Sequence, residues 1–433
     1  MKDIRVGRTL ARHYVTWGVL SLLVAGSGLS LVGAYLAADS RQAALSAAAW
    51  QAHAWATVVG WIAPVLLGLL GWILPLLKRS SYDAGRLQRH VLGLLAAGTL
   101  LVAAPALLEP MGRSSDYVLA IGWLLCLAAT AGYCGMAYRL SVRSLTPSAA
   151  DLGIQSGLVW LAATLLLRLA AAVGIMVTGR SDFMAASEPG VWLGAVFGFA
   201  ANLGLGLAAA LLPEFLRMPH TRPHVRAAFG AYNGLLAPLV VGFMWCLPNA
   251  YSWGRLPLIV CALGFLYATL HLMSRLQLGS LVFPPNHTRR QRAARLALGT
   301  AAFWLLTGAL VATGAAAWLA GFVEAPPPAL LSCATHLVAA GFFGNLVLAL
   351  GMALLGPTCL QGLRGWLSAS AYLLTNLWLL AGLAAAVLPL GEVASNWHLR
   401  GLAGITVGIG SLCLGLWLLW GFAHLDRREP GRE

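Results

Sequence analysis

Charged side chains are scarce in this sequence: only 10% of its 433 residues are Asp, Glu, Lys or Arg, whereas 59% are hydrophobic. So few charges cannot give a chain of this length a hydrated surface, which excludes an ordinary water-soluble domain. Acidic residues are the scarcest, with 14 Asp and Glu against 28 Lys and Arg. The seven cysteines form no CxxC pair, so neither a disulfide framework nor a thiolate metal cluster is expected.

The chain is rich instead in apolar runs of about 20 residues, the length that crosses a bilayer as a helix. Twelve such runs predict an all-α, polytopic membrane protein that forms a single transmembrane domain over residues 1–433, surrounded by the lipid bilayer. The connections are short and leave no room for a soluble domain. The predicted spans are residues 15–38, 50–77, 91–108, 117–138, 153–177, 191–216, 227–246, 256–274, 296–322, 330–355, 365–390 and 401–423.

The distribution of basic residues predicts the orientation, because loops that stay in the cytoplasm keep Lys and Arg. If the N-terminus is cytoplasmic, 22 of the 28 Lys and Arg lie on the inner side. We therefore expect a multi-pass protein of the bacterial inner membrane with both termini in the cytoplasm. Topology then explains the net charge of +14, and because the basic residues are spread over several inner segments, no nucleic-acid partner is expected.

Three of the apolar runs share a pattern: an early Gly-aromatic pair, small residues in the middle, and a proline near the inner end. The glycines are Gly60, Gly198 and Gly341, separated by 138 and 143 residues. Chance is the alternative explanation, because Gly and Pro are enriched in membrane helices. The spacing favours three pseudo-equivalent groups of four helices, with sites expected where repeats meet. These groups cover roughly residues 15–138, 153–274 and 296–423.

His53 and His336 lie on two of these runs, in spans two and ten, each some six residues past the predicted outer boundary. Both spans run from outside to inside, so the two imidazoles should lie at one depth. Histidine in hydrocarbon is costly, and a depth-matched pair indicates a bound metal or haem iron. The alternative is that each is an interfacial histidine, bonded to a backbone carbonyl.

Twelve helices in three groups of four, with histidines in helices two and ten, resemble the catalytic subunit I of haem-copper oxidases and nitric oxide reductases. More closely, AAWQAHAWATVVGWIAP and ATHLVAAGFFGNLVLALGMALLGP resemble the helix-two and helix-ten signatures of the NnrS family. The architecture covers the whole chain and the motifs only these two stretches. The resemblance implies that His53 and His336 are axial ligands of a six-coordinate haem, of b type, near the outer face. It also implies a link to denitrification and the nitric oxide response, with respiratory or denitrification proteins as partners.

The sequence departs from the oxidase pattern where oxygen would be reduced. That site needs a histidine in helix six, an adjacent pair in helix seven, and another two residues before the helix-ten ligand. Span six has no histidine, span seven has Tyr232 and Asn233 in its polar positions, and position 334 is Ala. We therefore expect no binuclear site and no terminal oxidase activity, while the copper content stays open.

Two arginines are candidate partners of the cofactor. Arg168 lies inside span five, where it could meet a haem propionate or extend toward the outer interface. Arg400, next to His398 in the predicted loop NWHLRG, could also meet a propionate, although a solvated loop charge is the commoner case.

Other polar residues have simpler interpretations. We expect interhelical hydrogen bonds from the buried side chains of Asn202, Asn345, Thr375 and Asn376. Five histidines are expected in solvent at the inner surface: His90, His220, His224, His287 and His424.

The leading hypothesis is a haem-binding membrane protein that carries electrons or senses a gas. A twelve-helix transporter or channel without haem is the first alternative, although transporters usually consist of two related halves. A scaffold for assembling a respiratory complex is the second.

Overall fold

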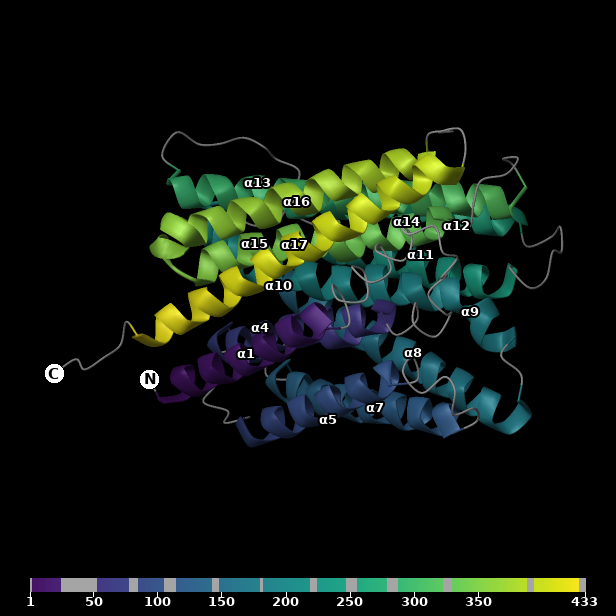
Figure 1. Cartoon of the computed structure of the whole chain (residues 1–433), viewed down its shortest axis with the longest axis horizontal. Helices are drawn as coiled ribbons and strands as arrows, with labels where there is room; N and C mark the ends of the chain where they lie inside the picture. The colour runs from purple at the N-terminus through teal and green to yellow at the C-terminus, as the bar shows by residue number, and fades with distance from the viewer. Residues whose placement is uncertain are drawn as a thin grey trace.

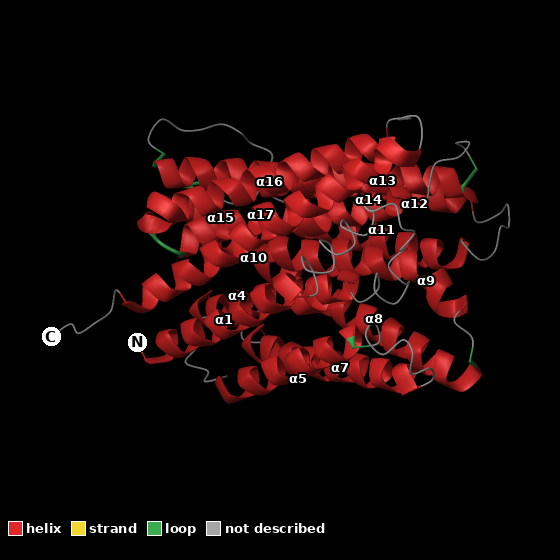
Figure 2. Cartoon of the chain, viewed as in Figure 1, coloured by secondary structure: helices red, strands yellow, loops and turns green. Residues whose placement is uncertain are grey.

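The structure, a computed structural model, describes residues 2–24, 53–77, 85–104, 114–141, 148–179, 182–218, 224–246, 255–278, 287–321, 329–387 and 393–427. Within these ranges it consists of helices and turns without a strand, as Figures 1 and 2 show, and the predicted all-α class is confirmed. Nine helices of the described part are not divided by a π segment and carry a single label: α1 (Lys2–Ser21), α5 (Gly85–Ala103), α7 (Ser114–Ser141), α8 (Ala149–Thr178), α11 (Val225–Cys246), α12 (Arg255–Leu276), α13 (Arg289–Leu319), α16 (Gly362–Val387) and α17 (Val393–Arg427).

Three further helices each contain a π-helical segment between α-helical parts. In the first, His53–Trp55 leads into η2 (Ala56–Ile62) and α4 (Ala63–Leu77). The other two are α9 (Asp182–Leu193) with η4 (Gly194–Ala201) and α10 (Asn202–Phe215), and α14 (Ala329–His336) with η6 (Leu337–Phe342) and α15 (Phe343–Leu354). A short 3₁₀ helix, η7 (Pro357–Leu360), follows.

Nine helices in the described ranges are long and apolar enough to cross a membrane, so the chain is a multi-pass membrane protein. The predicted spans at 15–38, 91–108 and 401–423 are not among the nine. Residues 25–52 and 105–113 lie outside the described part, and the apolar stretch Gly408–His424 is too short to be counted among the nine. A total of twelve spans therefore stays a prediction.

Helix α1 begins and helix α17 ends at the same end of the bundle, which we name the α1 end (Figure 1). The opposite end, where α9 lies, is named the α9 end. In the three helices with π segments, α9 and α14 lie nearer the α9 end than α10 and α15 do (Figure 1). Both helices thus run from the α9 end to the α1 end, and α4, the second part of the first such helix, also lies toward the α1 end (Figure 1).

The helices that carry π segments form the centre of the molecule. In their most apolar windows 89%, 83% and 78% of the residues are buried, against 56% or less in the other six candidate spans. Small residues allow this close packing, as is usual in membrane bundles. At Gly341, for example, an added Cβ would lie 2.6 Å from Cγ of Trp304.

The same helix contacts recur three times along the chain. A long helix packs on a central one in the pairs α1 with α4, α8 with α10, and α13 with α15. The two helices that follow pack on each other in the pairs α5 with α7, α11 with α12, and α16 with α17. Contacts of α7 with α8, α12 with α13 and α17 with α1 join these sets into a closed ring.

The π segments also match one another in position. Gly60, Gly198 and Gly341 are each the fifth residue of their segment. A π turn leaves carbonyl groups without their usual intrahelical donor, and side chains supply donors here. Asn202 Nδ2 donates to the Gly198 oxygen and Asn345 Nδ2 to the Gly341 oxygen, both at 2.7 Å. Since π segments are rare and often mark functional sites, the centre of the bundle is the candidate region.

Candidate functional site

His53 and His336 both lie just ahead of a π segment, on the side of the α9 end. His53 precedes the first residue of η2 by three positions, and His336 immediately precedes η6. At about 1.5 Å per residue, this difference of two positions is a height difference of roughly 3 Å. Both imidazoles are partly exposed.

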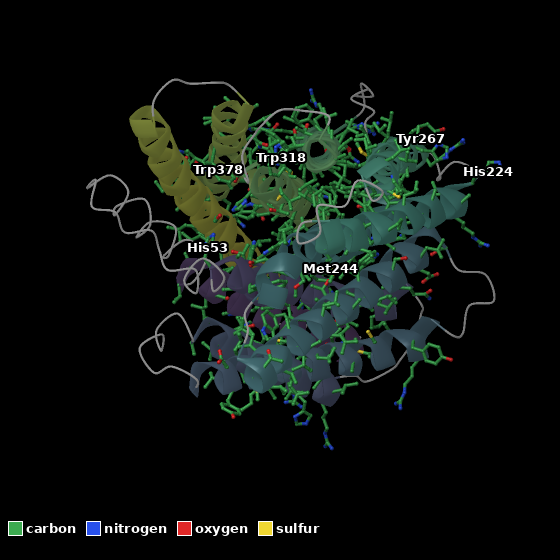
Figure 3. The ribbon with its side chains drawn as sticks, turned by 90° about the vertical axis from the view of Figure 1, so that its right-hand side faces the viewer. His53, His224, Met244, Tyr267, Trp318 and Trp378 are labelled. Atoms are coloured by element: carbon green, nitrogen blue, oxygen red, sulfur yellow. The ribbon has the colours of Figure 1, made fainter. Side chains whose placement is uncertain are left out.

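A tryptophan lies near each histidine, in space for His336 and in the chain for His53. The ring of His336 lies edge-on to Trp378 of α16, with 5.9 Å between centroids. Figure 3, which looks along the bundle from the α9 end, shows His53 and Trp378 in the same part of the projection. Trp55, two residues after His53, is 1% exposed and lies against Arg168.

Arg168 of α8 is completely buried, next to Trp55 at the start of the first central helix (His53–Leu77). Its Nη2 donates to Glu188 Oε1 at 3.1 Å, and its guanidinium carbon lies 4.5 Å from the centroid of the Trp55 ring. The exposed fraction of the side chain is 0% for Arg168 and 26% for Glu188. The guanidinium therefore does not extend into the interface: it is held inside by a carboxylate and a tryptophan face.

Two more tryptophans complete this cluster. Trp192 stacks on Trp55 with centroids 4.4 Å apart, and Trp123 meets Trp55 edge-on at 5.0 Å. Trp192 Nε1 also donates to Glu188 Oε1, at 3.3 Å. We name Trp55, Trp123, Arg168, Glu188 and Trp192 the Arg168 cluster. It joins the first central helix, α7, α8 and α9, where the first predicted group of helices meets the second.

Sequence reasoning missed four of the five members. The span was expected to begin at residue 191, just beyond Glu188 and Pro189. In the structure Pro189 lies inside α9, and the helix already begins at Asp182. One signal could have indicated the Arg168–Glu188 pair: an acidic residue close to the start of span six, next in the chain to span five with its lone arginine.

Arg400 and His398 fall in α17, but their side chains lie outside the described residues. The prediction that NWHLRG is a loop is wrong, because α17 begins at Val393. The sequence from Val393 to Arg400 contains neither Pro nor Gly, so nothing in it stops a helix that starts just after Gly391.

The interhelical hydrogen bonds expected of Asn202, Asn345 and Asn376 are present in two closely similar networks, while that of Thr375 stays a prediction. Trp160 Nε1 donates to Asn233 Oδ1 at 2.8 Å, and Asn233 pairs with Asn202. Trp304 Nε1 donates to Asn376 Oδ1 at 2.5 Å, and Asn376 pairs with Asn345. Asn202 and Asn345 each follow the glycine of their π segment by four residues. In the first central helix the residue four positions after Gly60 is Pro64, so this helix lacks the asparagine.

One of the five histidines expected in solvent is buried. His287, two residues before α13 begins, is only 4% exposed. His90 is exposed as predicted, and His220 lies outside the described residues. Among the described residues no three His, Cys, Asp or Glu side chains gather as a metal site would require.

No model of a known protein family and no curated protein sequence matches this chain.

Proposed function

We propose that this protein binds one haem, of b type, between its central helices, with His53 and His336 as the axial ligands of the iron. The observation that carries the proposal is the matched placement of the two imidazoles. They come from parallel central helices, and each stands within three residues of a π segment. For the whole bundle we propose three related groups of four helices, the arrangement of subunit I of haem-copper oxidases and of the NnrS family.

The residues present fit such a group chemically. Neutral imidazole is a common axial ligand of haem iron, and both rings are partly exposed rather than packed away. His336 sits beside the ring of Trp378, which suits a flat apolar macrocycle. Arg168 has buried N–H groups without a hydrogen-bond acceptor, at Nε and Nη1. Such donors suit the acid groups that a haem carries.

In this proposal His53 and His336 hold the cofactor, while Arg168 and Arg400 meet its acid groups. A bound haem would supply a one-electron carrier or a gas-responsive centre. Trp378, edge-on to His336, would help to shield such a centre from water, which tunes its potential. We propose no oxygen or nitric oxide reduction, because spans six and seven offer no further histidine.

The cellular role that we propose follows the NnrS resemblance: a protein of the bacterial inner membrane, linked to denitrification or the response to nitric oxide, with respiratory or denitrification proteins as partners. Both termini are proposed to be cytoplasmic. Supporting this, α1 begins and α17 ends at one end of the bundle (Figure 1), and the first turns of α1 carry Arg5, Arg8 and Arg12.

The direct test is the haem content of the purified protein after expression with added haem precursor. A pyridine haemochrome assay should give one haem b per chain. A stable, monodisperse preparation without haem would contradict the proposal.

A further inference from the structure

We propose that Arg168, Trp55 and Trp123 form a binding site for a small carboxylate or another planar oxyanion, and that Glu188 is its built-in competitor. The site does not depend on haem. The carboxylate could be a free anion or an acid group of a bound haem, and the experiment below separates these two sources.

The cluster has more buried donors than acceptors. A guanidinium has five N–H groups, and the acceptor found for Arg168 is one oxygen of Glu188, bonded to Nη2. The Nε and Nη1 atoms of Arg168 are buried without an acceptor, and so are Nε1 of Trp55 and Nε1 of Trp123. An unmet N–H costs more in a membrane interior than in water, so this cluster favours a ligand rich in acceptor oxygens.

Glu188 satisfies only part of the hydrogen-bonding capacity of the Arg168 guanidinium. A carboxylate that suits an arginine makes two parallel hydrogen bonds with the guanidinium fork. Glu188 instead offers Arg168 a single oxygen at 3.1 Å and shares it with Trp192 Nε1 at 3.3 Å. A planar anion that took this place could meet Nη2 together with a second nitrogen of the fork.

Exposure shows which partner can leave. The Glu188 side chain is 26% exposed and can turn toward the surface, whereas the Arg168 side chain is 0% exposed and held by the Trp55 face. An anion would therefore exchange with the Glu188 carboxylate in the space that this carboxylate now occupies. The buried charge would stay neutralised throughout.

This exchange predicts that removing Glu188 strengthens anion binding. In Glu188→Gln the guanidinium stays buried but loses its counter-ion, which is costly. An added anion then binds without competition and stabilises the folded state. In the double variant Arg168→Gln/Glu188→Gln both charges are gone, and anions should have no effect.

The experiment measures the thermal unfolding midpoint of the purified, haem-free full chain in detergent. Sodium formate is titrated at constant ionic strength, with a bulky sulfonate as the replacing anion. The midpoint of Glu188→Gln should rise by about 3 °C or more, while that of the double variant should move by less than about 1 °C. Equal responses of the two variants would overturn the proposal.

Two further arms complete the design. If Glu188→Gln does not yield folded protein, Glu188→Asp replaces it, because its carboxylate is one methylene shorter and reaches less far toward Arg168, and the same response is required of it. The titration is then repeated on haem-loaded protein. If haem abolishes the formate response, the natural carboxylate belongs to the haem; if the response persists, it is a free anion. A haem-free preparation that responds to formate would support the anion site even if the haem proposal failed.

Discussion

Asn202 and Asn233 hold two helices together by exchanging amide hydrogen bonds. Each Nδ2 donates to the Oδ1 of the other, at 2.9 and 3.0 Å. Asn345 and Asn376 repeat this exchange at 3.1 Å in both directions. In both pairs the partners are 31 residues apart, and in both a tryptophan of a third helix donates to the second asparagine. The pairs therefore tie equivalent helices in the second and third predicted groups.

Asn233→Leu should weaken the second group measurably. The change removes the acceptor of Trp160 Nε1 and takes from the Asn202 amide its partner on the neighbouring helix. Leaving buried donors unpaired costs on the order of 2 kcal/mol in the free energy of unfolding. We expect Asn376→Leu to have a similar effect. Unfolding in a mixed detergent series measures both, with lipid-facing Leu166→Ala as the control, since Leu166 is 56% exposed.

A methyl group at Gly341 should also destabilise the bundle. In Gly341→Ala the new Cβ would lie 2.6 Å from Trp304 Cγ and 2.8 Å from Leu379 Cδ1. Overpacking of this kind costs about 1–3 kcal/mol. Gly382→Ala is the matched control, because nothing lies within 4 Å of an added Cβ there. If both variants unfold at the same detergent concentration, the close approach of Gly341 and Trp304 is refuted.

The spans could be predicted from the sequence because burial in lipid demands long apolar runs, and these are visible without a structure. α11 shows this well: it was expected at 227–246 and found at Val225–Cys246. The three central helices were also distinguishable by their Gly-aromatic pairs. The π segments were not, because the helices that contain them are buried on nearly every side, so the extra residue in a π turn leaves no mark in their apolar pattern.

Of the candidate site, the sequence could predict only the residues that are energetically costly inside a membrane span, such as Arg168. Arg168 was recognisable because a cation inside a span needs a partner, but the sequence did not name Glu188, since the proline that follows it normally ends a helix. The partners of Trp160 and Trp304 could not be foreseen either. They depend on how each helix is rotated about its axis, and small-residue helices leave that rotation open.

Arg168→Leu should destabilise the protein more than the paired change Arg168→Leu/Glu188→Leu. The single change leaves Glu188 beside a tryptophan cluster without its cation, which costs up to about 3 kcal/mol, less than for a fully buried acid because the side chain is 26% exposed. The double change removes that cost. A double-mutant cycle of unfolding free energies measures the coupling, and additive effects would show that the two side chains do not interact.

The thiol of Cys359 should react slowly at neutral pH. It lies in η7, outside the spans, and is 1% exposed. Burial raises the pKa of this thiol, against a smaller opposite effect of Arg290 and Arg364. A raised pKa keeps the thiol protonated at neutral pH, so the rate of maleimide labelling should increase with pH beyond the range where ordinary thiols are already ionised. Peptide mapping by mass spectrometry follows Cys359 alone. A labelling rate at pH 7 equal to that of a cysteine placed at exposed Arg12 would contradict this.

The central claim is that His53 and His336 together hold a haem, and reduced-minus-oxidised optical spectra of variants test it most directly. The unmodified protein should show a sharp α-band of a six-coordinate, bis-histidine haem b. His53→Ala and His336→Ala should each lose it, while His90→Ala and His271→Ala, which change one exposed and one span-embedded histidine, should keep it. A normal α-band in either His53→Ala or His336→Ala would contradict the account.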